Sequence, residues 1–386
     1  MVKGFVGLLM LLPSLVLGVP YATLAEHWGI KRVLLLSIAG IFLGELWYDL
    51  VCWYGRSLPV ELIYLTPVFY LIGGGASVGV SLLFVLVANA SPAHLRPTRF
   101  FIMEASSVSG AIFGYMASSA IMDTLLWAPV LLGLGLIFLS FCLLLPVPDQ
   151  RPLDAEPPEE GMLEPASDDD TPKSTVRTLH TAVVVLKGQG SLVILLLGYL
   201  LRSLGGSVMT LMIIYSAQAF NWSFSRSGYL ASLDSTAHLA VLLLLPPLQR
   251  LLLSQSASDG TSNLFALARG SALLLAVGCA GMALAPSPAF FAISIVLYSL
   301  GGGYSQSIRS ILTASTPDEH RAITYTVMGI LDTVGTMVGA PVWPLVYRVG
   351  LKLAGPWIGL PFVTAAALFG GVYLTLFAGR QVNAVE

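Results

Sequence analysis

Long apolar runs separated by short polar connectors dominate this chain. Each run is about as long as the roughly 20 residues that an α-helix needs to span the hydrocarbon core of a bilayer. The pattern predicts eleven such helices, at residues 4–22, 33–53, 62–88, 98–120, 124–145, 191–218, 227–249, 265–285, 288–312, 322–346 and 356–378. Because backbone in lipid must satisfy its own hydrogen bonds, long apolar helices with short connectors predict an all-α polytopic membrane protein.

One polar segment divides the pattern. Between Asp149 and Asp170 the chain is rich in proline, aspartate and glutamate. Such a segment cannot bury a core and is expected to be a disordered linker, with binding of a partner protein as the alternative. The predicted organisation is therefore a five-span bundle at 1–145, a cytosolic linker at 146–188, a six-span bundle at 189–380 and a short tail at 381–386.

The composition supports a membrane location and excludes several classes of protein. Of the 386 residues, 56% are hydrophobic and only 10% are charged, whereas a soluble domain carries about 25% charged residues. The net charge of -2 is too small to create a strong electrostatic field that would attract nucleic acid. Three scattered cysteines have no metal-type spacing and define no disulfide framework. The predicted partner is the lipid bilayer, and no metal or cofactor is expected.

The basic residues predict an orientation. Alternate connectors on one side hold most of them, among them Lys31, Arg32, Arg96 and Arg99. That side is expected to be the cytosol, with the C-terminus inside and the N-terminus outside. Asn221 opens an Asn-Trp-Ser sequon on the predicted outer side and is a glycosylation candidate. Residues 1–18 resemble a signal peptide, but the run lacks a small-residue cleavage site, so a span is favoured.

A glycine-rich stretch fits two motifs. Gly75-Ala-Ser77-Val-Gly79 matches the nucleophile elbow of a hydrolase, which requires a strand-to-helix turn. It also matches a glycine pair on a helix face that packs closely against a neighbour. The same spacing recurs at Gly110 with Gly114 and at Gly335 with Gly339. The repetition favours packing, so an enzyme is not predicted and an intramembrane serine hydrolase is the weaker alternative.

Four ionisable residues lie well inside predicted spans: Arg202, Asp234, His238 and Asp332. A charge at mid-bilayer costs about 2.5–3.5 kcal/mol on insertion scales, so such residues usually face a cavity or each other. Asp234 and His238 are four residues apart and share a helix face. We expect all four to face the interior, where they would recognise a charged substrate or load a proton. The alternative is a structural Arg–Asp pair between two helices.

Other charges lie nearer the ends of spans. Glu104 and Arg309 are near predicted cytosolic ends and are candidates for a gate or latch, with Arg99 or Arg96 as possible partners of Glu104. Glu45 and Asp49 lie near an outer end, where interface positions are expected.

The first connector carries the most informative short motif. In Leu24-Ala25-Glu26-His27-Trp28-Gly29-Ile30-Lys31-Arg32 the glycine permits a tight reversal. The acid can cap a neighbouring helix, and the bases hold the turn in the cytosol. The stretch resembles the loop motif G-x-L-A-D-R-x-G-R-K/R of the major facilitator superfamily, with matches at Leu24, Ala25, Gly29 and Lys31. Further likeness to fungal members covers residues 215–247, 301–310 and 355–362.

This resemblance implies two helical bundles that rock around a central site and carry a small organic molecule. For fungal members it also implies proton-driven transport, with a secondary metabolite as the exported solute and the plasma membrane, or a vacuolar or other endomembrane, as the location. Relative to the family, one span rather than two precedes the loop, so the first helix is expected to be missing. The span at 98–120 also lacks the Gly-Pro motif of proton-driven exporters. A truncated or non-transporting relative that acts as a receptor or scaffold is the alternative.

Overall fold

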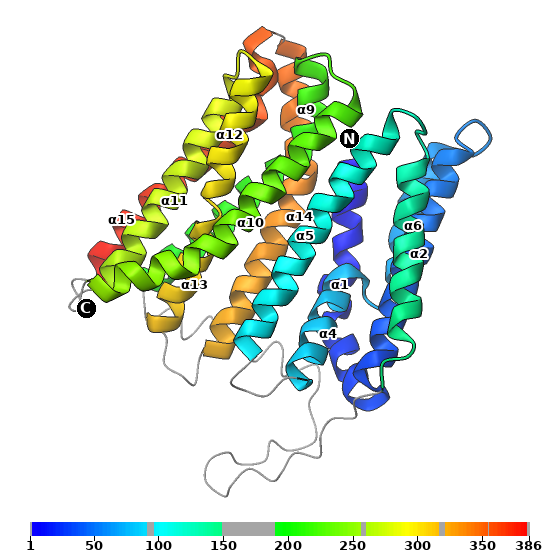
Figure 1. Ribbon diagram of the computed structural model, residues 1–386, viewed down its shortest axis with the longest axis horizontal. Helices are drawn as coiled ribbons and strands as arrows, with labels where there is room; N and C mark the ends of the chain where they lie inside the picture. The colour runs from blue at the N-terminus through cyan, green and yellow to red at the C-terminus, as the bar shows by residue number, and fades with distance from the viewer. Residues whose placement is uncertain are drawn as a thin grey trace, which may run out of the picture. The chain divides into compact units, whose positions relative to one another are not determined.

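A computed structural model describes residues 2–90, 96–148, 190–255, 260–315, 321–353 and 355–383 (Figure 1). Within these ranges every regular element is helical. The first half contains α1 (Val2–Trp28), α2 (Ile30–Trp53), η1 (Val60–Leu65), α3 (Thr66–Tyr70), α4 (Gly75–Asn89), α5 (Arg96–Met122) and α6 (Ala128–Leu144). The second half contains α8 (Gly190–Gly206), η3 (Ser207–Leu211), α9 (Met212–Ala219), α10 (Phe224–Gln255), α11 (Gly260–Ala283), α12 (Pro288–Leu300), α13 (Gly303–Ser315), α14 (Arg321–Leu353), η5 (Gly355–Gly359) and α15 (Leu360–Asn383).

These helices confirm the predicted all-α fold, because each of the eleven predicted spans coincides with a helix or a run of helices. Among the described residues, seven segments are long and apolar enough to cross a bilayer: Ile30–Trp53, Val60–Val87, Val193–Ala219, Leu264–Ala283, Pro288–Leu312, Val327–Leu353 and Trp357–Leu376. The predicted linker lies outside the described residues from 149 onward, so its disorder stays a prediction.

The chain forms two compact units. The N-terminal unit comprises Val2–Glu104 and Trp127–Thr175, and the C-terminal unit comprises Ala105–Leu126 and Val176–Glu386. Most of α5 therefore groups with the helices that follow the linker. One reason is a contact with α10, where the Ser225 hydroxyl donates to the Ser119 carbonyl oxygen over 2.6 Å. The predicted division at the linker remains a sequence-based prediction.

Three spans that the sequence predicts as continuous are interrupted. The first breaks between α3 and α4, where Gly73, Gly74 and Gly75 have φ of 87°, 78° and 78°, a left-handed backbone that favours glycine. The second tightens into the 3-10 turn η3 between α8 and α9. The third breaks at Gly301 and Gly302, between α12 and α13. The apolar run continues through each break, so hydropathy alone does not reveal it.

Side chains of neighbouring helices form hydrogen bonds with the backbone of the break between α3 and α4. The Tyr21 hydroxyl donates to the Leu71 carbonyl oxygen over 2.8 Å and accepts from the Gly73 N–H over 2.9 Å. The Ser37 hydroxyl donates to the Gly75 carbonyl oxygen over 3.0 Å. Polar backbone groups that the break frees are thus paired with side chains of α1 and α2, as apolar surroundings require.

Each unit has its own apolar core. In the N-terminal unit, α1, α2 and α4 meet around Val33, Leu34 and Val78. In the C-terminal unit, α11 and α8 both pack on α15. An aromatic cluster joins α9, α12 and α15 there, with ring centroids 4.9 Å apart for Tyr215 and Phe362 and 5.5 Å apart for Tyr215 and Phe291.

The three glycine pairs have different surroundings. A Cβ atom at Gly335 would lie 2.7 Å from the Ser203 Cβ, and one at Gly339 would overlap the Ser207 hydroxyl, so α14 approaches α8 and η3 closely. A Cβ at Gly75 or Gly79 would lie 2.8 Å from Ser14 Oγ or 2.9 Å from Ser37 Oγ, respectively. A Cβ at Gly110 or Gly114 would have no described heavy atom within 4 Å. The structure therefore gives the pair on α5 no close neighbour, and its packing role stays a prediction.

Candidate functional site

A polar cavity of about 490 Å³ lies in the C-terminal unit. Its wall is formed by α5, α8, η3, α10, α11, α12 and α14, together with the break that follows α12. The lining residues are Ser107, Val108, Ala111, Arg202, Ser203, Gly206, Ser207, Met209, Thr210, Asp234, Ser235, His238, Leu275, Tyr298, Ser299, Gly302, Asp332 and Thr336. Most of the polar side chains are hydroxyls, so the cavity can form many hydrogen bonds.

All four ionisable residues singled out in the sequence line this cavity. Arg202 comes from α8, Asp234 and His238 come from α10, and Asp332 comes from α14. Each of these side chains is half-buried. The structure thus brings together residues that are up to 130 positions apart in the chain, counted from Arg202 to Asp332.

Asp234 is held by a hydroxyl from a second helix. The Ser299 hydroxyl of α12 lies 2.6 Å from the Asp234 carboxylate and 2.8 Å from the Ile295 carbonyl oxygen of its own helix, so its one proton is donated to one of these oxygens at a time or is shared between them. His238 lies one turn further along α10 and interacts electrostatically with Asp234. A Cβ at Gly302 would approach the His238 Nδ1 to 3.0 Å. The last turn of α12 therefore provides the hydroxyl partner, and the glycine break that follows provides the room for the imidazole.

Asp332 of α14 also lies beside a serine hydroxyl, which comes from α8. The Ser203 hydroxyl of α8 lies 2.8 Å from the Asp332 carboxylate and 2.9 Å from its backbone carbonyl oxygen. A hydroxyl carries one proton, so it donates to one of these oxygens at a time or is shared between them. The contact ties α8 to α14 and leaves the other carboxylate oxygen of Asp332 available to the cavity.

Arg202 is placed differently from the two acids. Its guanidinium forms no hydrogen bond and no ion pair within 4 Å with any residue that the structure describes. It interacts electrostatically with the phenol groups of Tyr298 and Tyr304. The described residues therefore include no Arg–Asp pair with Arg202.

Two helix interruptions border the cavity. Ser207, Met209 and Thr210 lie in η3, and Gly302 lies in the break after α12. Trp343 of α14 is 1% exposed, and its indole N–H lies 2.9 Å from both the Leu204 carbonyl oxygen and the Ser207 hydroxyl. In membrane carriers, sites are typically built from such discontinuous helices, since unwound backbone can bind ligand groups.

Sequence reasoning missed the side chains that hold the two acids. Ser203, Ser299 and Trp343 were not singled out, because serine and tryptophan are common in apolar helices. A weak signal was present for two of them. Ser203 directly follows Arg202, and Ser299 directly precedes the apolar residue before the triple glycine at 301–303.

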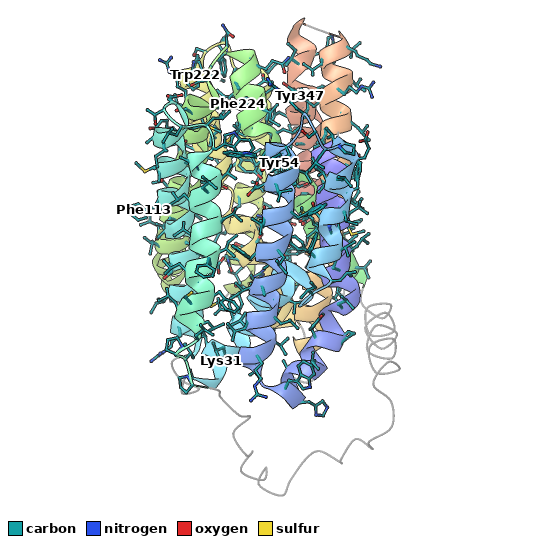
Figure 2. All side chains as sticks on the ribbon, turned by 90° about the vertical axis from the view of Figure 1, so that its right-hand side faces the viewer. Lys31, Tyr54, Phe113, Trp222, Phe224 and Tyr347 are labelled. Atoms are coloured by element: carbon teal, nitrogen blue, oxygen red, sulfur yellow. The ribbon has the colours of Figure 1, made fainter. Side chains whose placement is uncertain are left out.

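The loop motif lies in the N-terminal unit, between α1 and α2. Gly29 has φ of 96° and separates the two helices without a further connecting residue. Lys31 donates from its Nζ to the Leu145 carbonyl oxygen over 2.7 Å. This contact places a cation at the C-terminal end of α6, where the helix dipole is negative. Figure 2 shows Lys31 and Tyr54 at opposite ends of α2.

The other residues of the loop motif differ in how deeply they are buried. Ala25 is buried and Leu24 packs against the same apolar cluster as Val33. Arg32 is exposed. The side chain of Glu26 lies outside what the structure describes, and its capping role stays a prediction.

The remaining candidates lie away from the cavity. Glu104 is exposed and pairs with no described residue. Arg309 is exposed, and its Nη2 lies 3.4 Å from the Tyr199 hydroxyl of α8. Asn221 is exposed in the turn between α9 and α10, with φ of 51°. Figure 2 shows Trp222 and Phe224, which follow it, at the same end of the C-terminal unit as Tyr347.

Ser77 lacks the setting of a catalytic nucleophile. It lies in the first turn of α4, a helix preceded by the glycine break rather than by a strand, and the described part of the chain contains no strand. The same part places no group of three or more His, Cys, Asp or Glu side chains for a metal ion.

Comparison with known proteins identifies relatives along most of the chain. An MFS efflux pump of Emericella nidulans, atnC, is 28% identical over 367 residues, which cover 94% of this chain and 71% of that protein. The efflux pump ustT of Aspergillus flavus is 26% identical over 89% of this chain and 70% of its own length.

Solved structures share the fold. The crystal structure of a D-xylose-proton symporter has a TM-score of 0.71 at 14% sequence identity and covers 97% of this chain and 86% of its own. The nucleoside transporter NupG has a TM-score of 0.68, also at 14% identity, and covers 99% and 90%. At this identity the likeness concerns the fold alone.

A sequence profile of the Major Facilitator Superfamily matches residues 2–256, which is well over half of the chain. The resemblance seen in the loop motif is thereby confirmed, and the hydrolase alternative based on Ser77 is excluded. The chain belongs to the Major Facilitator Superfamily, and it is a multi-pass membrane transporter rather than an enzyme.

Proposed function

We propose that this protein is a secondary active transporter that exports a small organic solute by alternating access and is coupled to protons. The observation that carries the proposal is the convergence of Arg202, Asp234, His238 and Asp332 on one polar cavity. Ionisable groups at membrane depth typically mark substrate or ion sites. Fungal relatives along most of the chain are named as efflux pumps, and this supports export, with a secondary metabolite as the solute class.

One feature of the site supports proton coupling. Neither carboxylate is paired with Arg202 in the described residues, although each lies beside a serine hydroxyl. A carboxylate that no arginine holds in its charged form can take up a proton when it is shielded from water. The hydroxyl can then turn and accept instead of donate, because it has both capacities. Asp234 and Asp332 are the proposed proton carriers, with His238 beside the first.

The test compares Asp234→Asn and Asp332→Asn with the wild type in yeast cells exposed to a mixture of fungal extracts. Mass spectrometry of the cells identifies compounds whose accumulation falls when the wild-type protein is present. Both variants should lose this effect at unchanged membrane abundance, and a protonophore should abolish it in the wild type. Asp123→Asn changes an exposed acid at the end of α5 and should behave as the wild type.

Two results would contradict the proposal. One is a wild-type protein that changes the accumulation of no compound, which would favour the receptor or scaffold alternative. The other is full export by both variants, which would remove the proposed role of the acids. Export from the cell places the protein in the plasma membrane, and a fluorescent fusion would distinguish this from a vacuolar or other endomembrane location.

A further inference from the structure

Resting on the proposed function, we propose that the transported solute is an organic anion and that Arg202 binds its anionic group, a carboxylate, sulfate or phosphate. Arg202 lines the cavity, where its guanidinium has no hydrogen bond or ion pair with the described residues. A guanidinium offers five N–H donors in a planar fork that matches such groups in two-point contacts. The solute then supplies a partner that no described residue provides.

The charge of Arg202 is permanent, whereas the other charges of the cavity are not. An arginine side chain is not deprotonated in proteins, and an unpaired charge at membrane depth is costly. As the proposed proton carriers, Asp234 and Asp332 each lose their charge when they bind a proton. The charge of Arg202 then remains in the cavity. An anion is the ligand that complements this state.

No residue that the structure describes pairs with that charge. Tyr298 of α12 and Tyr304 of α13 are the residues that interact electrostatically with Arg202 in the described structure. A phenol ordinarily titrates near pH 10 and is neutral at physiological pH. The two acids of the cavity are held by serine hydroxyls from other helices instead.

The rest of the wall suits an organic body with further oxygen atoms. Apolar surface is supplied by Val108, Met209 and Leu275. Hydroxyl groups that face the cavity without holding an acid belong to Ser107, Ser207, Thr210, Ser235 and Thr336. Pockets of this kind bind ligands by apolar contact and orient them by a few polar groups.

A matched pair of probes tests the inference by direct binding. Dansylglycine carries a carboxylate, and dansylglycinamide is its neutral analogue with the same fluorescent body. Titration of the purified protein in detergent should show about tenfold or tighter binding of the anion, because hydrogen bonds to charged groups are among the stronger ones. Arg202→Gln should bring the affinity for dansylglycine down to that for the amide and leave amide binding unchanged.

Two further variants sharpen the result. Arg202→Lys keeps the charge but loses the planar fork, so it should retain part of the preference. Arg226→Gln removes an exposed arginine of α10 outside the cavity and should retain all of it. Amide binding also reports that the cavity of each variant is intact.

The inference is overturned if the wild type binds dansylglycine no more tightly than the amide, or if Arg202→Gln keeps the preference. Preferential binding of the cationic analogue dansyl-ethylenediamine would also overturn it and would assign recognition to the acids. These outcomes are separate from those of the export assay. A protein that exports solutes but lacks anion preference disproves only this inference, and one that binds anions through Arg202 without export disproves only the proposed function.

Discussion

At the scale of single residues, the site is defined by pairs of hydrogen-bonding side chains from different helices. The sequence predicted the ionisable members of these pairs, since charges are rare in apolar runs and each one stands out. It also predicted that Asp234 and His238 share a helix face, from their spacing alone. It could not predict Ser203 or Ser299, because a serine in an apolar helix can bond to its own backbone, as Ser294 and Ser307 do.

The bond from Ser299 to Asp234 predicts a measurable loss of stability. Ser299→Ala removes the hydroxyl partner of a half-buried carboxylate, and the free energy of unfolding should fall by about 1–3 kcal/mol. The thermal unfolding midpoint in detergent measures this loss. Ser140→Ala is the control, because that exposed serine bonds only to the carbonyl oxygen of its own helix. Equal midpoints for the two variants would show that the bond contributes little.

Trp343 gives a second residue-scale prediction. Trp343→Phe keeps most of the apolar volume but removes the N–H that reaches Leu204 and Ser207 at the start of η3. We expect destabilisation of about 1 kcal/mol, since one hydrogen bond is lost while the Leu204 carbonyl oxygen keeps the Ser207 hydroxyl as a donor. Trp357→Phe, at a position that is 52% exposed, should leave the unfolding midpoint nearly unchanged. The same midpoint for both variants would argue against a role for the indole N–H.

At the scale of elements, hydropathy predicted where the helices lie but not where they break. The helices are apolar on most sides, so neither the lipid-facing side nor an interruption leaves a mark in the pattern. Glycines mark two of the three breaks, at 73–75 and 301–302, although glycine is frequent in membrane helices for other reasons. The 3-10 turn at Ser207–Leu211 has no such mark beyond Gly205 and Gly206.

The two glycine pairs on α14 and α5 predict opposite responses to the same substitution. Gly339→Ala would force a methyl group into the Ser207 hydroxyl, and overpacking costs about 1–3 kcal/mol. Gly110→Ala adds a methyl group where no described atom lies within 4 Å, and alanine favours a helix over glycine. Thermal unfolding should therefore show a lower midpoint for Gly339→Ala and an equal or higher one for Gly110→Ala.

A lowered midpoint in Gly110→Ala would instead reveal a close partner of α5 and would support the packing role that the sequence predicted for this pair. An unchanged midpoint in Gly339→Ala would mean that α14 can move away from η3 at little cost.

At the scale of the whole molecule, composition and the length of the apolar runs predicted the class of protein, and a short loop motif indicated the family. Both could be read from the chain because they depend on local sequence. The cavity could not, because it requires α8, α10, α12 and α14 to converge, and contacts between distant helices are not encoded in any local pattern.

Orientation in the membrane is the prediction that belongs to this scale. In a background without the native Cys52, Cys142 and Cys279, single cysteines replace Asn221 and Arg32, which are both exposed. A membrane-impermeant maleimide should label Asn221→Cys in intact cells, because the turn after α9 is expected outside. It should label Arg32→Cys only after the membrane is opened. The reverse pattern would invert the predicted topology.

The glycine break between α3 and α4 has a consequence for movement. Tyr21 of α1 and Ser37 of α2 hold the freed peptide groups of the break. If α1, α2 or α4 slid along its neighbours, these hydrogen bonds would break. The amide and carbonyl groups of the break would then be unpaired in hydrocarbon, where no water can replace the lost partners. Sliding is therefore penalised, and α1, α2 and α4 should travel as one rigid block through every step of the transport cycle.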